Sequence, residues 1–126
     1  MMAFDWKKPT AQMLGRWQPW HDAHTELFKR ALAQTGQVCI MVRDVQGWED
    51  NPFDYEQVWH GIRDGLAAAG YEYSIHYIVM RVPNVVDISY GRGVGYKIEE
   101  IVLDKETQKI SATKIRQQMR DHGDLI

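Results

Sequence analysis

Two histidines placed three residues apart are the first side chains along the chain that could do chemistry. His21 and His24 follow the turn-rich stretch that begins at Gly15, where a helix is predicted from about Asp22 to Ala33. Residues at this spacing lie on the same side of a helix, and the first helical turn exposes unpaired N–H groups and the positive end of the helix dipole. An anion such as a triphosphate is drawn to that place, so both imidazoles could donate hydrogen bonds to phosphate.

A plainer interpretation is also open for this pair, in which His21 caps the helix and His24 packs against the rest of the chain. A zinc site is disfavoured, because the pair has no cysteine and no third histidine near it, and zinc normally takes three or four ligands. We therefore predict no metal site made by the protein alone. Gly15 has no side chain, which lets the backbone approach a ligand closely.

A second cluster lies near the C-terminal end of the chain. Ser111 and Thr113 carry hydroxyl groups at the predicted start of the last helix, and Arg116 follows one turn later. Ser111 can cap that helix, and a guanidinium group binds phosphate through two parallel hydrogen bonds. Taken alone, the cluster is also compatible with an ordinary helix start.

Strands and helices alternate between the two clusters in the pattern of a parallel sheet. Strands are predicted at 10–14, 37–42, 71–82 and, for a short fourth one, 85–88; helices are predicted at 22–33, 54–69 and from 111 onward. Asp54 and Gln57 have the spacing of a capping box, and Gly36 and Gly70 are natural helix stops. We predict an α/β fold, Rossmann-like, with a doubly wound parallel sheet of about five strands and helices on both faces.

Length and composition limit what the chain can be. Its 126 residues, 44% of them hydrophobic, indicate one domain spanning 1–126, with residues 1–9 as an N-terminal arm. A formal net charge of -2 disfavours general coating of nucleic acid, and no apolar run approaches the roughly 20 residues of a membrane span. The single cysteine lies in an apolar strand. We expect a cytoplasmic protein with no nucleic-acid or membrane partner.

In this order, the two clusters resemble the signatures of the HxGH/ISxTxxR nucleotidyltransferase superfamily, which has a cytidylyltransferase-like fold. Residues 15–24, GRWQPWHDAH, are similar to that family's GRFQPxHxGH, and residues 110–116, ISATKIR, match ISxTxxR. The segment 51–53, NPF, resembles the nicotinamide-mononucleotide adenylyltransferase branch. The resemblance spans about Met13 to Arg120. Ala23 departs from this pattern, because the family usually has glycine there. The added methyl group could shift the base or the ribose of the nucleotide, or reduce activity.

The resemblance implies a nucleotidyltransferase that moves a nucleoside monophosphate, AMP from ATP, onto a phosphorylated small-molecule acceptor and releases pyrophosphate. Mg²⁺ would accompany the triphosphate. The resemblance further implies catalytic roles for His21, His24 and Arg116, and nucleotide binding by the residues Gly15, Arg16, Trp17, Gln18, Ser111 and Thr113.

Three loops hold weaker candidates. Arg43 and Asp44 directly follow the second predicted strand and could reach the acceptor, or could be solvated loop charges. Arg92 lies among three glycines that would let its guanidinium approach a phosphate, although a flexible surface turn is equally compatible. Trp48, in the loop 46–50, could cover the acceptor as part of a lid or pack on a partner subunit.

Other functions stay open at this point. The chain could be a nucleotide-binding module that has lost catalysis, or a cytidylyltransferase that uses CTP. It could also be a homo-oligomer in which a neighbour completes the acceptor site, since 126 residues leave little room for a full acceptor pocket and five of them are tryptophan.

Overall fold

The computed structural model describes residues 3–45, 50–92, 95, 97–98, 101 and 111–123. In this part of the chain, three strands alternate with two helices and a further helix follows near the C-terminus. In chain order the elements are β1 (Ala11–Gly15), α1 (Asp22–Thr35), β2 (Val38–Arg43), α2 (Tyr55–Ala68), β3 (Tyr77–Val82) and α4 (Ala112–Asp121). The predicted α/β class is confirmed.

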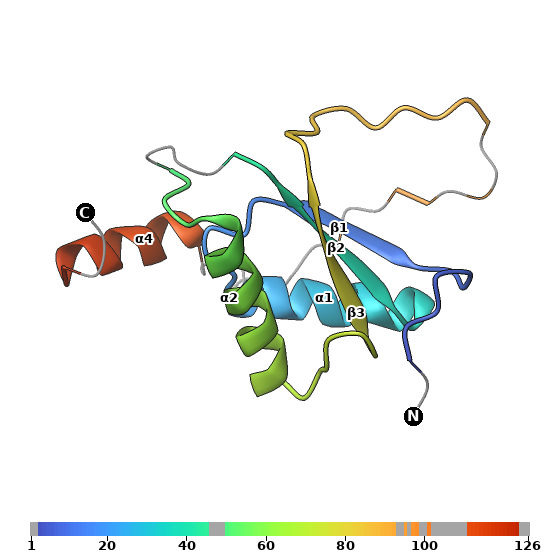
Figure 1. Cartoon of the computed structure of the whole chain (residues 1–126), viewed down its shortest axis with the longest axis horizontal. Helices are drawn as coiled ribbons and strands as arrows, with labels where there is room; N and C mark the ends of the chain where they lie inside the picture. The colour runs from blue at the N-terminus through green and yellow to red at the C-terminus, as the bar shows by residue number, and fades with distance from the viewer. Residues whose placement is uncertain are drawn as a thin grey trace.

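The three strands form one parallel sheet in the order β1-β2-β3 (Figure 1). Met13, Ile40 and Val79 are partners across it, so they share one face. In β2, alternate residues Val38, Ile40 and Val42 are fully buried, as expected when every second side chain points the same way.

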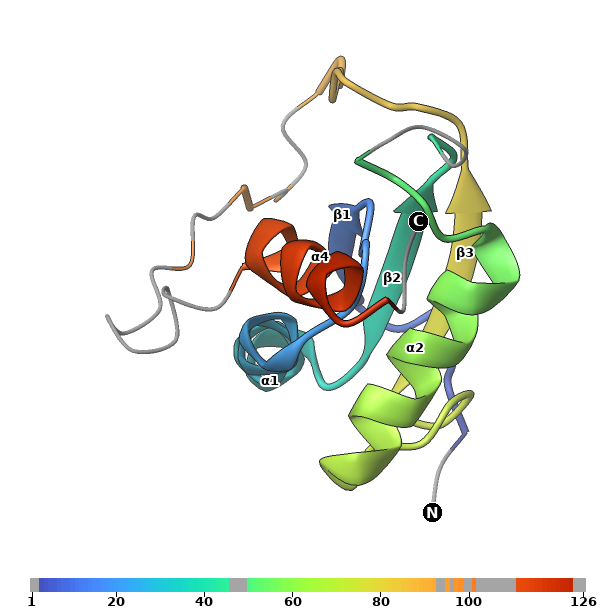
Figure 2. The same ribbon diagram turned by 90° about the vertical axis from the view of Figure 1, so that its left-hand side faces the viewer.

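Helices α1 and α2 cover the same face of this sheet (Figure 2). Phe28 of α1 and Ile62 of α2 are both fully buried and belong to one core cluster with Ile40. A parallel strand pair is joined by a right-handed crossover, and two successive crossovers in the same direction place both helices on one side. The described residues therefore do not show the predicted helices on both faces.

The strand count also differs from the prediction of about five, because the described residues form three strands. Residues 85–88, predicted as a fourth strand, are not paired, and most of them are exposed. Residues 71–76, predicted to open β3, form a turn instead. Ser74 has a φ of 67°, and the His76 N–H donates to the Glu72 carbonyl at 3.0 Å, so local hydrogen bonds replace ladder bonds there.

The predicted helix starts and the first helix stop are confirmed. Asp54 caps α2, with its side chain accepting from the Gln57 N–H and the Gln57 side chain accepting from the Asp54 N–H. Ser111 caps α4. Gly36 ends α1 with a φ of 86°, a left-handed conformation that glycine adopts at little cost.

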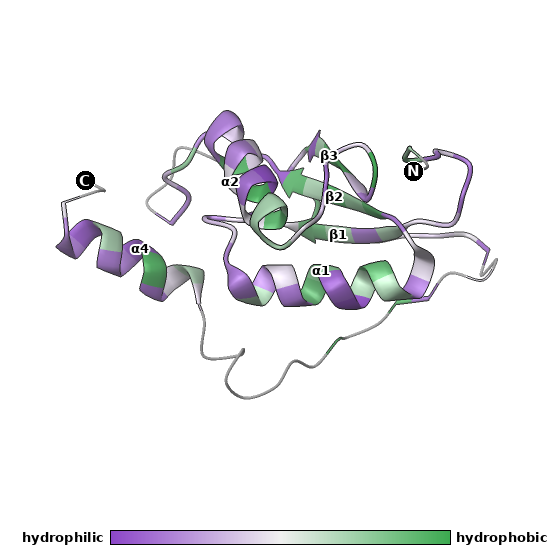
Figure 3. Cartoon of the chain, turned by 90° about the horizontal axis from the view of Figure 1, so that it is seen from below, coloured by the Kyte–Doolittle hydropathy of each residue, from purple (hydrophilic) through white to green (hydrophobic). Residues whose placement is uncertain are grey.

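Polar and apolar residues are mixed along all three described helices (Figure 3). None of these helices combines the length and the apolar content that crossing a bilayer requires. In Figure 1, α4 and the starts of α1 and α2 lie toward the left, and the strands end toward the top of the view. We call this end of the sheet the carboxyl edge, and the opposite end the amino edge.

Candidate active site at the carboxyl edge

In the loop after β1, the indole ring of Trp17 packs against Gly15. Trp17 has a φ of 53°, and its indole N–H donates to the Met41 carbonyl at 3.0 Å. A Cβ at Gly15 would lie 2.8 Å from the Trp17 ring. Gly15 therefore makes room for this indole rather than for a ligand. Trp17 is 6% exposed, so most of its ring is buried inside the protein and little is offered to a nucleotide.

Each histidine of the pair caps the start of α1 through its Nδ1 atom. The His21 Nδ1 accepts from the Ala23 N–H, and the His24 Nδ1 accepts from the His21 N–H, both at 3.2 Å. Because Nδ1 accepts in both rings, the neutral tautomer carries its proton on Nε2. The capping role considered from the sequence is thus confirmed for His21, and each imidazole keeps an Nε2–H donor that the cap does not use.

The two imidazoles stack on each other and are held in their neutral form. Their centroids are 3.7 Å apart at an interplanar angle of 18°, and the His24 ring meets Trp17 edge-on at 4.7 Å. Burial, and secondly the neighbouring His21, lower the pKa of His24 to about 3. Burial also lowers the pKa of His21, against the opposing effect of Asp22. At neutral pH, both rings are uncharged hydrogen-bond donors.

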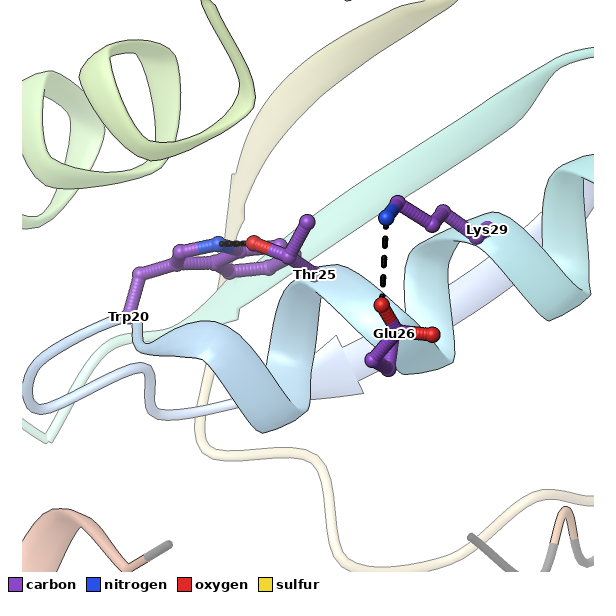
Figure 4. A network of polar contacts seen from close by, with 4 residues as sticks. All are labelled: Trp20, Thr25, Glu26 and Lys29. Carbon is purple, nitrogen blue, oxygen red and sulfur yellow. Dashed lines mark hydrogen bonds and ion pairs between the residues drawn. The ribbon is translucent and has the colours of Figure 1, made fainter. Parts of the chain in front are cut away.

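The first turn of α1 is also held by Trp20 (Figure 4). The Trp20 indole N–H donates to the Thr25 hydroxyl at 2.9 Å, and both side chains are buried. A Cβ at Gly65 of α2 would lie 2.8 Å from the Trp20 ring, so α2 approaches this indole closely only because it has glycine there. The ion pair of Glu26 and Lys29 in the same figure is half exposed.

Arg116 brings the C-terminal cluster to the loop before α1. It is 4% exposed, and its Nη1 donates to the backbone carbonyl of Gln18, 98 positions away in the sequence. Its Nη2 donates to the Thr113 hydroxyl at 3.3 Å. Ser111 caps α4 beside them. The two predicted segments thus touch at Gln18, and no described contact joins Arg116 to the imidazole of His21 or His24.

Gln18 is buried, and its side chain binds protein. Its Oε1 accepts from the Phe53 N–H at 2.9 Å, and its Nε2 donates to the Phe53 carbonyl at 3.0 Å. With 2% exposure, the side chain has no free surface for the nucleotide contact suggested by the resemblance. No pattern within the sequence identified Phe53 as its partner, because the two are 35 positions apart.

Positive charge gathers around Arg116. Burial, together with the guanidinium groups of Arg16 and Arg120, lowers the pKa of Arg116, while the Asp50 carboxylate acts in the opposite direction. Arg120 was not predicted as a site residue. The sequence contains a pattern that points to it, because Arg116 and Arg120 are four positions apart on one helix and therefore share a face. Such a group of cations favours an anionic ligand.

The candidates for acceptor binding lie further along the carboxyl edge. Asp44 accepts two hydrogen bonds from Arg81 of β3, a partner that the sequence interpretation missed. Arg43 reaches the Val85 carbonyl at 3.5 Å. Arg92 is exposed on the segment after β3, which runs away from the helices in Figure 1, and no described contact joins it to the histidine pair. Trp48 and residues 46–49 lie outside the described residues.

A groove of about 430 Å³ lies next to the loop before α1, and its lining includes neither histidine of the pair nor Arg116. It is lined by residues of the loop before α1, of α2 and its preceding loop, and of α4: Trp17, Pro19, Trp20, Phe53, Gln57, Val58, His60, Gly61, Asp64 and Met119. Among the described residues, no three His, Cys, Asp or Glu side chains are grouped so that they could hold a metal ion.

No model of a known protein family matches this chain, and no curated protein matches it in sequence.

Proposed function

We propose that this protein is a nucleotidyltransferase that transfers AMP from the Mg²⁺ complex of ATP to a phosphorylated small-molecule acceptor, with release of pyrophosphate. One observation carries the proposal: the hydrogen bond from Arg116 to the Gln18 carbonyl joins the segment 110–116 to the segment 15–24 at the carboxyl edge. In open α/β sheets, ligands bind beyond the carboxyl ends of the strands. The proposal also rests on the resemblance of both segments to the nucleotidyltransferase superfamily.

The histidine pair suits a developing negative charge on phosphorus. Both rings are neutral, both are fixed by the Nδ1 caps, and each has an Nε2–H donor left over. Donors that are already oriented need no rearrangement during the reaction, which is the main way in which enzymes stabilise such charge. The N-terminus of α1 adds its unpaired N–H groups and its dipole.

Arg116 would hold the phosphates that leave as pyrophosphate. Its two described hydrogen bonds use one N–H each on Nη1 and Nη2, and a guanidinium has further N–H groups to donate. The side chain is 4% exposed, so a phosphate would reach it at this small exposed edge. The acceptor phosphate would attack the α-phosphorus in line, without a covalent enzyme intermediate.

Ala23 bears on how well this site can work. The residue is 8% exposed and donates its N–H to His21, so its methyl group lies mostly against protein rather than in open space. The substitution of the family's glycine is therefore compatible with an intact helix start. We expect nucleotide binding to be retained.

A thermal-shift screen followed by an activity assay tests the proposal. ATP, CTP and tripolyphosphate are each added with Mg²⁺ to the wild-type protein and to Arg116→Ala. A ligand at 100 times its Kd raises the free energy of unfolding by about 2.7 kcal/mol, which is readily measured. We expect ATP to stabilise the wild type more than CTP does, and Arg116→Ala to lose most of the effect.

Pyrophosphate release is then measured with a panel of nucleoside and sugar monophosphates as acceptors. Release with at least one acceptor supports the transferase. Stabilisation by ATP without release from any acceptor would assign a binding module instead, and the absence of any triphosphate binding contradicts the proposal as a whole.

A further inference from the structure

The side chain of Gln18 holds the loop before α2 by a matched pair of hydrogen bonds. Its amide accepts from the N–H and donates to the carbonyl of one residue, Phe53, at 2.9 and 3.0 Å. Two bonds to the same peptide segment fix both the distance and the orientation of that segment. At 2% exposure, water does not compete for these groups.

The backbone of the same residue holds α4. The Gln18 carbonyl is the acceptor for Arg116 Nη1, and the bond is buried. His21, which caps α1, follows three positions later in the same loop. Gln18 therefore joins three parts of the chain that are distant in sequence: the loop before α1, the loop before α2, and α4.

We propose that Gln18 is a positioning residue, which sets Arg116 and the histidine pair at one relative distance so that a single polyphosphate meets both. This inference rests on the proposed function. It replaces the nucleotide contact that the resemblance implied for the Gln18 side chain. The role is exerted through Arg116, because the buried glutamine amide binds Phe53 through both its oxygen and its nitrogen.

Electrostatics gives the reason why such a fixed point is needed. The Asp50 carboxylate attracts the Arg116 guanidinium and is the strongest single charge acting on it, while Arg16 and Arg120 repel it. The Gln18 carbonyl, itself in a loop tied to Phe53, holds Arg116 at one position among these opposing charges. Binding then costs less reorganisation, because the cation is already where the anion arrives.

The chain contains a matched control for this role. Gln37 is also buried, at 6% exposure, and its amide also binds the N–H and the carbonyl of one distant residue, Asp5, at 3.1 and 2.6 Å. This pair lies at the amino edge and holds the N-terminal arm. Replacing Gln37 removes the same kind of bonds without touching the carboxyl edge.

The test compares Gln18→Met with Gln37→Met, since methionine has nearly the length of glutamine and makes neither bond. The Kd for tripolyphosphate is measured by calorimetry, with circular dichroism as the check that each variant is folded at the temperature used. We expect Gln18→Met to raise this Kd about tenfold, the effect of weakening one charge-assisted hydrogen bond, and Gln37→Met to change it less than twofold. Both variants should melt at lower temperature than the wild type.

The outcomes separate this inference from the proposed function. Unchanged tripolyphosphate affinity in folded Gln18→Met overturns the positioning role while the proposed function stands. An equal loss of affinity in both variants also overturns it, because the effect is then one of general stability. If the wild type does not bind tripolyphosphate at all, the proposed function itself fails, and with it any role of Gln18 in anion binding.

A second pair of variants covers the case in which Gln18→Met does not fold. Gln18→Asn keeps a neutral amide but shortens the side chain by one methylene group, so that it no longer reaches both groups of Phe53, and Gln37→Asn makes the same change at Asp5. We expect the same ranking, with a rise in Kd for the Gln18 variant that exceeds that of the Gln37 variant. Equal affinities for this pair overturn the inference.

Discussion

Two buried glutamines at opposite ends of one sheet each bind the N–H and the carbonyl of one distant residue, and Gln37 donates in addition to Thr10 and Lys8. Gln18 holds Phe53 at the carboxyl edge, and Gln37 holds Asp5 at the amino edge, each through the N–H and the carbonyl of its partner. The two glutamines differ in the residues that lie on the segments they connect. Gln18 connects a histidine pair to Arg116, whereas Gln37 connects the sheet to the N-terminal arm. Similar local chemistry thus joins the parts of a candidate site at one edge and holds the N-terminal arm at the other.

Histidines at the two edges repeat the contrast. The Nδ1 of His24 accepts from the His21 N–H at the carboxyl edge, and the Nδ1 of His76 accepts from the Glu72 N–H at the amino edge. Both are local caps of a chain segment. Only His24 stacks on a second imidazole beside a helix N-terminus, where an anion is attracted. The comparison predicts that equivalent substitutions at the two edges have different consequences.

The largest expected difference is in catalysis. His24→Ala should lower the turnover number for pyrophosphate release by about 10²–10³, the usual effect of losing one donor to a developing charge. His76→Ala removes a similar hydrogen bond and should leave turnover within about twofold. Steady-state kinetics of both variants at a temperature where both are folded measures this. Equal turnover of His24→Ala and the wild type would remove the histidine pair from the mechanism.

A smaller difference is expected in the pH dependence of stability. The pKa of His24 is lowered to about 3 in the folded protein, so below about pH 6.5 the unfolded chain binds a proton that the folded chain does not. The free energy of unfolding should therefore fall with decreasing pH, by about 1.4 kcal/mol per pH unit between those two values. Above about pH 6.5 this contribution is constant.

Urea denaturation of the wild type and of His24→Ala, near pH 7 and near pH 5, measures the contribution of His24 together with its coupling to the stacked His21, because the more distant titrating groups cancel in the difference. His76→Ala is the control and should keep the slope of the wild type. A wild-type slope equal to that of His24→Ala would show that the imidazole is not held neutral.

The smallest expected effect concerns the packing of α2 beneath the site. Gly65→Ala would place a methyl group 2.8 Å from the Trp20 ring and should destabilise the protein by about 1–3 kcal/mol. Gly61→Ala, one turn earlier, meets nothing within 4 Å and should stabilise the helix by about 0.8–1 kcal/mol. Opposite shifts in thermal melting confirm the packing, and equal shifts contradict it.

Local signals were sufficient for the elements and for part of the site. The helix starts at His21, Asp54 and Ser111 follow from capping residues and their spacing, because a cap depends on atoms only two or three residues away. Strand β2 follows from the continuous apolar run that ends at Val42, and β3 from its β-branched and aromatic residues. Residues 71–76 were predicted as strand because Tyr and Ile favour strands, and the turn around Ser74 overrides that preference.

The sequence by itself determined which residue types stand at the carboxyl edge, because each strand ends directly before a loop that carries polar or charged residues. Only the tertiary structure decided what those residues do. Gln18 and Trp17 turn inward to Phe53 and Met41, and Gly15 serves the Trp17 indole. The physical reason is range: caps and periodicity act over a few positions, whereas a bond such as that of Arg116 to Gln18 spans 98 positions and exists only once the sheet has brought its loops together.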